Sequence, residues 1–379
     1  MKYYYPVIAI FLLIGCAKKK GTIEFAGKTP GIKNGVFVIR TVKDSTVYGD
    51  NIRGEKFSIT KQLEKPGYYQ LDITDADNPD KHLPFEVYLE NGKYTIETEP
   101  GKLYKYPKIT SPSKIQEQLS SFYTISDQLS AENQKTVTEL NNKLKSKEKL
   151  LTTREYVALI NTKTDAENKV AQSNIIAFKQ FVKQYPNSGI SAHLMSKLNY
   201  DDDAATYNTI FKTLSPEAKN SEEGLEIGKR LEHLVKLVPG AKAPVIEGKM
   251  PDGKAFSPAS LTKKYVLLEF WKAGNDMATL NHEKIKMLLT QTTPKKDLEI
   301  ISVSLDKDPA WWAAGIRNDK LKWTQIADLK GNESPNAVNW SITRLPMYYL
   351  LDKDWHILMR DVNLGTLDSD VGDYIRLHP

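Results

Sequence analysis

Cysteine is almost absent from this sequence, since its 379 residues include only Cys16. An internal disulfide framework and any site that needs two thiolates are therefore excluded. An excess of charge of one sign is also lacking, because 53 Lys and Arg residues face 47 Asp and Glu residues. The short basic run 18–20 has no interleaved aromatic residues that would stack on bases, so the sequence does not indicate nucleic-acid binding.

The spacing typical of metal and phosphate sites is lacking too. His282-Glu283 has no second histidine to complete a zinc motif. Asp201-Asp202-Asp203 continues with Thr206 and Lys212 where a calcium loop needs Gly and Glu, which favours a solvated helix start. No phosphate-binding glycine loop with Lys and no Gly-x-Ser-x-Gly elbow occurs, so we predict neither a metal nor a cofactor. The histidines considered are His82, His193, His233, His282, His356 and His378.

Long hydrophobic runs are missing as well. The apolar stretch at residues 7–14 is far shorter than the roughly 20 residues of a membrane-spanning helix, and it fits the core of a signal peptide. The tetrapeptide Leu13-Ile14-Gly15-Cys16 is similar to a lipobox, in which the cysteine is acylated on sulfur and becomes the first mature residue. We expect a signal peptide at residues 1–15 and a lipidated tether at residues 16–21. The alternative is a secreted protein whose leader contains a cysteine by chance.

The predicted lipid anchor at Cys16 sets the expected location. Acyl chains bury about 0.8 kcal/mol per methylene, so several of them would hold the chain on a bilayer. Residue 17 is Ala, and similarity to Gram-negative lipoproteins without an inner-membrane retention Asp favours the outer membrane. We expect a membrane-anchored protein of the cell envelope that faces the periplasm. The sequence gives neither the leaflet nor the oligomeric state.

Residues 22–106 form a succession of short β patterns, rich in aromatic and β-branched residues and separated by Gly, Pro, Asn and Asp. The clearest hairpin is expected at residues 85–97, where Asn91-Gly92 supplies the turn. About seven such strands predict a small antiparallel β-sandwich. No site is visible in it, so a structural or adhesive role is the default. A nutrient-capturing surface protein would need an aromatic-lined groove in this region.

Residues 107–112 indicate a linker, after which the hydrophobic period becomes that of helices. Ile115, Leu119 and Phe122 share one stripe, which is typical of core packing. The polar stretch at residues 131–168 predicts a long solvated helical hairpin. Together these patterns predict a helical spacer or bundle, which extends over residues 113–238 and closes at Pro239-Gly240.

Strands and helices alternate in residues 239–379. Residues 265–271 form a continuous apolar run, the pattern of a strand buried on both faces of a sheet. A helix is expected from about residue 275 to 289, followed by a second buried strand at residues 298–305 and a hairpin at residues 348–359. This order predicts an α/β domain with a mixed sheet. The whole chain is predicted to be a multidomain α+β protein.

Several motifs of this last region carry a resemblance to a known family. They are Pro239-Gly240, Ala243-Pro244, Leu267-Leu268-Glu269-Phe270-Trp271, Val303-Ser304-Leu305-Asp306, and Leu345-Pro346 ahead of Tyr349-Leu350-Leu351-Asp352. Residues 239–379 resemble the thioredoxin-like domain of periplasmic, membrane-associated disulfide reductases and of their AhpC/TSA-type peroxiredoxin relatives. The preceding β and helical regions resemble the domains that commonly stand before thioredoxin modules in such lipoproteins.

The resemblance implies a Cys-x-x-Cys pair at a helix start, where the helix dipole and free amides lower the thiol pKa. Those two positions are Asn275 and Ala278 here, in the tetrapeptide Asn275-Asp276-Met277-Ala278. Neither side chain can form the mixed disulfide through which exchange proceeds, so thiol–disulfide chemistry is excluded at this site. We expect Asn275 or Asp276 to cap the helix instead.

Other landmarks implied by the resemblance survive in part. Glu269 matches the buried acid that assists proton transfer, and is expected to be a leftover or an acid paired with a nearby Lys such as Lys272. Pro346 matches the cis-proline that shapes a peptide-binding edge. Gly274 stands where the family usually has an aromatic residue, and Trp355 stands where the hairpin turn usually has Gly.

These observations favour a non-catalytic, lipid-tethered envelope protein whose degenerate thioredoxin-like domain binds a protein or peptide partner. The alternative is a thiol–disulfide oxidoreductase-family protein that acts with a cysteine-bearing partner. A variant of that alternative has altered chemistry around Glu269, Asp276 and His282, which would then have to converge on one pocket.

Overall fold

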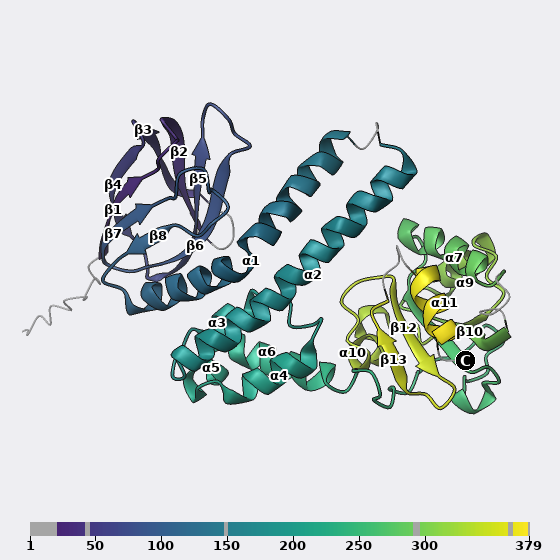
Figure 1. Cartoon of the computed structure of the whole chain (residues 1–379). Helices are drawn as coiled ribbons and strands as arrows, with labels where there is room; N and C mark the ends of the chain where they lie inside the picture. The colour runs from purple at the N-terminus through teal and green to yellow at the C-terminus, as the bar shows by residue number, and fades with distance from the viewer. Residues whose placement is uncertain (1–20, 42–45, 148–150, 291–295, 363–366, 378–379) are drawn as a thin grey trace, which may run out of the picture. The chain divides into compact units, whose positions relative to one another are not determined.

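The computed structural model describes residues 21–41, 46–147, 151–290, 296–362 and 367–377 (Figure 1). Cys16 and the predicted signal peptide lie outside the described residues. The chain divides into two compact units, Met1–Leu198 (unit 1) and Asn199–Pro379 (unit 2). The boundary lies inside the predicted helical region 113–238, so its first helices belong to unit 1 and its last helices to unit 2.

Unit 1 contains one eight-stranded sheet with the strand order β6-β5-β2-β3-β4-β1-β7-β8. Its two halves meet at β3 and β4, which share the registered pair Arg53 and Lys56. The strands are β1 (Gly21–Lys28), β2 (Asn34–Thr41), β3 (Thr46–Arg53), β4 (Lys56–Leu63), β5 (Gly67–Asp75), β6 (His82–Leu89), β7 (Gly92–Glu97) and β8 (Lys108–Thr110).

The strand pairing corrects two expectations. The sheet is not purely antiparallel, because β1 and β7 run parallel. The predicted hairpin at residues 85–97 is wrong, since β6 pairs with β5 whereas β7 pairs with β1 and β8. Asn91 accepts a hydrogen bond from the Thr22 amide at 2.8 Å, so the residue expected to form a tight turn holds the start of β1.

Side chains from both halves of the sheet form one core. Phe37 of β2 stacks on Phe57 of β4 with 4.3 Å between ring centroids, and meets Phe25 of β1 edge-on at 5.5 Å. Fully burying each such ring stabilises the fold by about 1.5–3 kcal/mol. The predicted linker at residues 107–112 contributes β8 to the edge of the sheet, because Ile109 pairs with Ile96 and packs against the same core.

The helices of unit 1 are α1 (Lys114–Lys147), α2 (Thr153–Gln184) and α3 (Ser191–Ser196). The first two form the predicted helical hairpin (Figure 1). Thr152 and Glu155 form a capping box at the start of α2, in which Thr152 Oγ1 accepts from the Glu155 amide at 3.3 Å. Within the described residues no helix has both the length and the apolar character needed to cross a bilayer.

Unit 2 begins with α4 (Ala204–Thr213), α5 (Pro216–Asn220) and α6 (Glu222–Leu234). Asp203 caps α4, since its Oδ1 accepts from the Thr206 amide at 3.1 Å. Asp201 pairs with Arg230 at 2.6 Å. The predicted helix start at the triple-Asp run is therefore confirmed.

The remainder of unit 2 has a five-stranded mixed sheet with the order β11-β10-β9-β12-β13. The first three strands in this order are parallel, and β12 is antiparallel to both of its neighbours. This arrangement confirms the predicted α/β pattern. The strands are β9 (Tyr265–Trp271), β10 (Leu298–Ser304), β11 (Thr324–Ala327), β12 (Met347–Asp352) and β13 (Ile357–Arg360). The helices are η2 (Pro258–Ser260), α7 (Asp276–Leu288), α9 (Pro309–Asn318), η3 (Gly331–Glu333), α10 (Pro335–Asn339) and α11 (Leu367–Leu377).

Every residue of β9 is buried, as expected for a central strand covered on both faces. One face, which includes Phe270, packs in a cluster with Trp340 and Tyr349, and the other face packs under α7 and α11. This sheet positions the residues discussed below, because β9 ends at Trp271 and the chain turns directly into α7.

Candidate functional site

Asn275 is the N-cap of α7, the helix that follows the central strand. Its Oδ1 accepts hydrogen bonds from the amides of Met277 at 3.0 Å and Ala278 at 3.3 Å. These amides belong to the free donors of a helix start, which a side-chain oxygen satisfies. The expected capping role is confirmed for Asn275, and the register that places residues 275–278 at this helix start is correct.

The same side chain also reaches the loop before β12. Asn275 Nδ2 donates to the carbonyl oxygen of Leu345 at 3.3 Å, and the Leu345–Pro346 peptide bond is cis, as the resemblance implied. Both polar ends of the amide are therefore used in hydrogen bonds within the fold. We call Asn275, the exposed side chains of Met277 and Leu280 on the following helix, and Trp311 beside Gly274 the mouth.

The two ends of the degenerate motif have different surroundings. Ala278 is buried in a cluster with Trp271 and Trp312, so its methyl group fills space in the core. Met277 has half of its surface exposed. Asp276 is the first residue of α7. Its side chain is not among those that the structure describes.

The mouth exposes apolar side chains. Met277, Leu280 and Trp311 are 51%, 59% and 62% exposed. Trp311 lies beside Gly274, where a Cβ would come within 3.3 Å of the indole ring. Gly274 has a positive φ of 76°, a conformation that glycine adopts without strain. The glycine in place of the expected aromatic residue thus leaves room for the tryptophan of α9.

Glu269 is fully buried on β9, and of the two expectations for it, a leftover acid or one paired with a nearby Lys such as Lys272, the pairing is not found, because its partners are two hydroxyls and a histidine. Tyr348 OH donates to Glu269 Oε1 at 2.8 Å, and the hydroxyl of Ser302 donates to Oε2. His282 Nε2 lies 3.2 Å from the same Oε2. Tyr348, Glu269 and Ser302 lie side by side in register on neighbouring strands. This position explains why the hydroxyl groups of Tyr348 and Ser302 donate hydrogen bonds to the carboxylate of Glu269.

His282 of α7 lies between two carboxylates. Its Nδ1 is 2.6 Å from Asp319 Oδ2, and Asp319 follows the end of α9 with 11% of its side chain exposed. Burial alone would lower the pKa of His282, but the hydrogen bonds and charges of Glu269 and Asp319 raise it above its usual 6.5. A protonated His282 donates to both carboxylates and so compensates their charges.

The acquired-chemistry hypothesis is only partly met by this geometry. Glu269 and His282 do converge, and Asp319, which the sequence analysis missed, completes the set. The side chains of Glu269 and His282 are both 0% exposed, however. Reacting atoms must touch a substrate, so a sealed pair of this kind serves as an internal ion network. The sequence signal for it was Glu269, the one charged residue in the apolar run 265–271.

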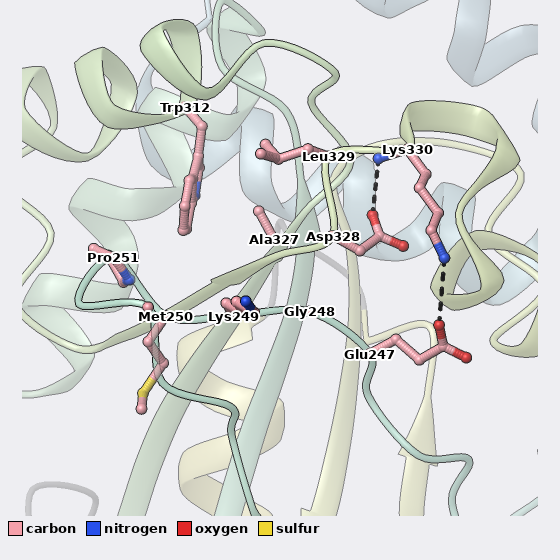
Figure 2. Close-up of a pocket in the computed structure, with 11 residues that line it drawn as sticks. Glu247, Gly248, Lys249, Met250, Pro251, Trp312, Ala327, Asp328, Leu329 and Lys330 are labelled. Carbon is pink, nitrogen blue, oxygen red and sulfur yellow. Dashed lines mark hydrogen bonds and ion pairs between the residues drawn. The ribbon is translucent and has the colours of Figure 1, made fainter.

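A pocket of about 440 Å³ lies beside the end of β11 (Figure 2). Met250, Pro251 and Trp312 form its apolar walls, and Lys330 Nζ lies 3.6 Å from Glu247 Oε2 on the rim. Its described lining includes no Ser, Cys, His or Tyr. The pocket therefore offers apolar contact beside the charged side chains of Glu247, Lys249, Asp328 and Lys330.

Trp355 lies in the turn between β12 and β13 with a positive φ of 64°. Its indole Nε1 donates to the carbonyl oxygen of Pro244 at 2.8 Å, and its ring packs against Trp340. A buried tryptophan has thus replaced the expected glycine because its packing offsets the backbone cost.

Among the described residues no group of three His, Cys, Asp or Glu side chains has the geometry of a metal site.

No protein-family profile matches the chain, and no curated protein matches its sequence. Solved structures do match it. The thioredoxin domain of a thiol-disulfide oxidoreductase from Bacteroides vulgatus is 25% identical with a TM-score of 0.34, covering 37% of this chain and 99% of that domain. A thiol-disulfide oxidoreductase from Bacteroides fragilis is 28% identical with a TM-score of 0.32, covering 35% of this chain and 98% of that one.

A longer match is a thioredoxin-like protein from Bacteroides caccae, which is 20% identical with a TM-score of 0.46 and covers 60% of this chain and 86% of that one. The mixed sheet, the helix after its central strand and the cis-proline agree with the resemblance found in the sequence. Over part of its length the chain is similar to thioredoxin-like domains of thiol-disulfide oxidoreductases, and its one cysteine, Cys16, leaves it without a redox pair.

Proposed function

We propose that the chain is a lipid-anchored envelope protein whose thioredoxin-like part binds a polypeptide partner and performs no thiol–disulfide exchange. The observation that carries this proposal is the position of Asn275. Its amide stands where the nucleophilic thiol would stand, and it bonds the helix start and the Leu345 carbonyl. A side chain used in this way stabilises the mouth and has no bond to exchange.

The apolar surface of the mouth supports polypeptide binding. Met277 and Leu280 lie three residues apart on α7 and so share one face of the helix. Methionine and tryptophan are enriched at protein interfaces, because a flexible thioether and a large ring fit varied partners. The partner expected here presents an apolar segment of its own.

The lipid anchor rests on the tetrapeptide that ends at Cys16 and on the short apolar stretch before it. Metabolic labelling with palmitate tests this part. We expect the label on the full chain and its loss in Cys16→Ser. Equal labelling of the two chains would refute the anchor, and orientation toward the periplasm would then lose its basis.

The absence of redox chemistry is tested with a reductant and insulin as the disulfide substrate. The full chain should give no turnover above the buffer blank. The paired change Asn275→Cys and Ala278→Cys restores the motif on the same scaffold, and it should form an internal disulfide and raise turnover. Turnover by the unchanged chain would overturn the proposal.

Binding at the mouth is tested by capture of envelope proteins on the immobilised chain. Met277→Glu places a charge in the apolar surface and should abolish capture of a specific partner. Leu225→Glu is the matched control, since Leu225 is 62% exposed on α6 and outside the mouth. Equal capture by both variants would contradict a partner site at the mouth.

Altered catalysis around Glu269 and His282 is not favoured as a second function, because both side chains are sealed from solvent. The alternative hypothesis, a protein of the thiol–disulfide oxidoreductase family that acts with a cysteine-bearing partner, predicts insulin turnover only after that partner is added. The capture experiment supplies the protein needed to test it.

A further inference from the structure

A cleft of about 760 Å³ in unit 1 lies between α1 and the segment that joins β7 to β8. Tyr106 and Tyr185 are the aromatic residues of its described lining. On the other side, α1 contributes polar residues that include Thr124, Asp127 and Gln128. The volume is in the range of about 300–1,000 Å³ that is usual for small-ligand sites. Its lining contains four carboxylates and two ammonium groups. They are Glu97, Glu99, Glu117 and Asp127, and Lys105 and Lys108.

Asp127 is a partly buried carboxylate with a fixed geometry in this cleft. Its Oδ2 accepts a hydrogen bond from the Tyr106 amide at 2.5 Å. Tyr106 is itself held, because its hydroxyl donates to the Glu86 carbonyl at 2.7 Å and its ring stacks on Tyr123 at 4.7 Å. One oxygen of Asp127 is thus fixed by the backbone, and among the residues that the structure describes no hydrogen-bond donor is found for Oδ1.

No cation of the described chain pairs with Asp127. Lys105 lies close enough for its charge to act on Asp127, but its ion pair is with Glu99 at 4.0 Å. The helix itself supplies none, since residues 115–134 of α1 include no Lys, Arg or His. Burial raises the pKa of Asp127 to about 6, because the loss of water outweighs the opposing effects of the Tyr106 amide and of the charge of Lys105.

Glu86 of the same unit provides an internal comparison. It is more deeply buried, but His193 Nε2 lies 3.0 Å from its Oε2 and Lys197 Nζ lies 3.0 Å from its Oε1. Burial opposes ionisation there as well, yet those two partners lower the pKa of Glu86 below its ordinary value. Glu86 thus has two direct basic partners, whereas Asp127 in the open cleft has none among the described residues and keeps a raised pKa.

We propose that this cleft binds a primary ammonium group, with Asp127 Oδ1 as its charged anchor. A guanidinium prefers two parallel bonds to both oxygens of a carboxylate, and Oδ2 is already occupied by the backbone. An ammonium needs one strong acceptor and makes its other bonds to hydroxyl or amide oxygens, which Thr124 and Gln128 offer on the same face of α1. The aromatic lining suits the alkyl part of such a ligand.

The probes are n-butylamine, its neutral analogue 1-butanol and its guanidino analogue butylguanidine, titrated into the full chain and followed by NMR shifts of α1. We expect the amine to bind at least tenfold more tightly than either analogue. Its affinity should rise with pH through about 6, as Asp127 ionises. Equal binding of amine and alcohol, or tighter binding of butylguanidine, would overturn the assignment.

The variant Asp127→Asn keeps the shape of the side chain and should weaken butylamine binding at least tenfold. Glu132→Gln is the matched control, because it removes one exposed negative charge from the same helix outside the cleft. Two larger probes distinguish the source of the ammonium. Cadaverine represents a free amine, and acetyl-lysine methylamide represents a lysine of a partner protein. If neither of these binds, or if the two variants bind butylamine alike, the site is refuted.

Discussion

Asn275 joins two segments with three hydrogen bonds from one side chain. Asn275→Ala removes all three, and the loss of the cap together with the bond to Leu345 should cost about 1–2 kcal/mol of unfolding free energy. Urea unfolding followed by tryptophan fluorescence measures this change. Asn275→Ser separates the contributions, since Ser retains the cap acceptor and loses the donor to Leu345. We expect it to recover about half of the loss, and an Ala variant as stable as the original would show that the cap is dispensable.

His282 links the stability of unit 2 to pH. Its pKa is above 6.5 in the folded chain, so the folded state holds this proton more tightly than the unfolded state does. The resulting stabilisation is complete below pH 6.5 and is lost as pH rises through the folded pKa. We therefore expect the urea midpoint to fall from pH 6.5 upward, and His282→Gln to flatten this part of the profile. Trp271, whose ring is 4.9 Å from His282, reports the transition, and identical profiles for the two chains would contradict this role.

At the scale of elements, α2 begins at a capping box, and its contribution to the stability of the helix start can be measured against a control substitution in the middle of the same helix. Thr152→Ala removes the oxygen that accepts from the Glu155 amide and should destabilise the helix start by about 1 kcal/mol. Thr162→Ala is the same change inside α2, where Ala is the better helix former, so it should be neutral or slightly stabilising. Hydrogen exchange of the first-turn amides distinguishes them, and equal protection in both variants would contradict the capping box.

Elements defined by local patterns were predictable from the sequence, whereas long-range pairing was not. The apolar run of residues 265–271 and the caps at Asp203 and Asn275 follow rules that act within a few residues. The parallel pairing of β1 with β7 joins segments about 70 residues apart, and the Asn91-Gly92 signal for a turn gave no hint of it. Periodicity fixes which face of a strand is buried and leaves open which strand lies next to it.

The candidate site shows the same limit. The cap position of Asn275 and the burial of Glu269 could be read from the motif and the apolar strand around it. Asp319 could not, because it meets His282 across 37 residues and follows a helix whose docking no local pattern specifies. Asp127 was hidden for a similar reason, since only the Tyr106 amide, 21 residues away, identifies it as a fixed carboxylate.

At the scale of the whole molecule, the compact unit begins at Asn199, whereas the thioredoxin-like domain was predicted to begin at residue 239. The added helices are tied to the sheet, since Arg360 Nη1 of β13 donates to the Asp201 carbonyl at 2.8 Å. A hydrogen bond from a charged donor contributes about 1.5–3 kcal/mol. A fragment 199–379 should therefore unfold cooperatively and be more stable than a fragment 239–379 by at least that amount.

Urea unfolding of the two fragments, compared with the full chain, measures this difference. Both fragments retain the six tryptophans, which all lie after residue 239, so one fluorescence signal serves for all three chains. Asp201→Asn within fragment 199–379 is an informative control, because it weakens the pair with Arg230 at 2.6 Å and leaves the carbonyl bond to Arg360 in place. It should lose only part of the added stability. If the shorter fragment is as stable as the longer one, α4 to α6 do not stabilise the sheet, and the thioredoxin-like part begins at residue 239 as predicted.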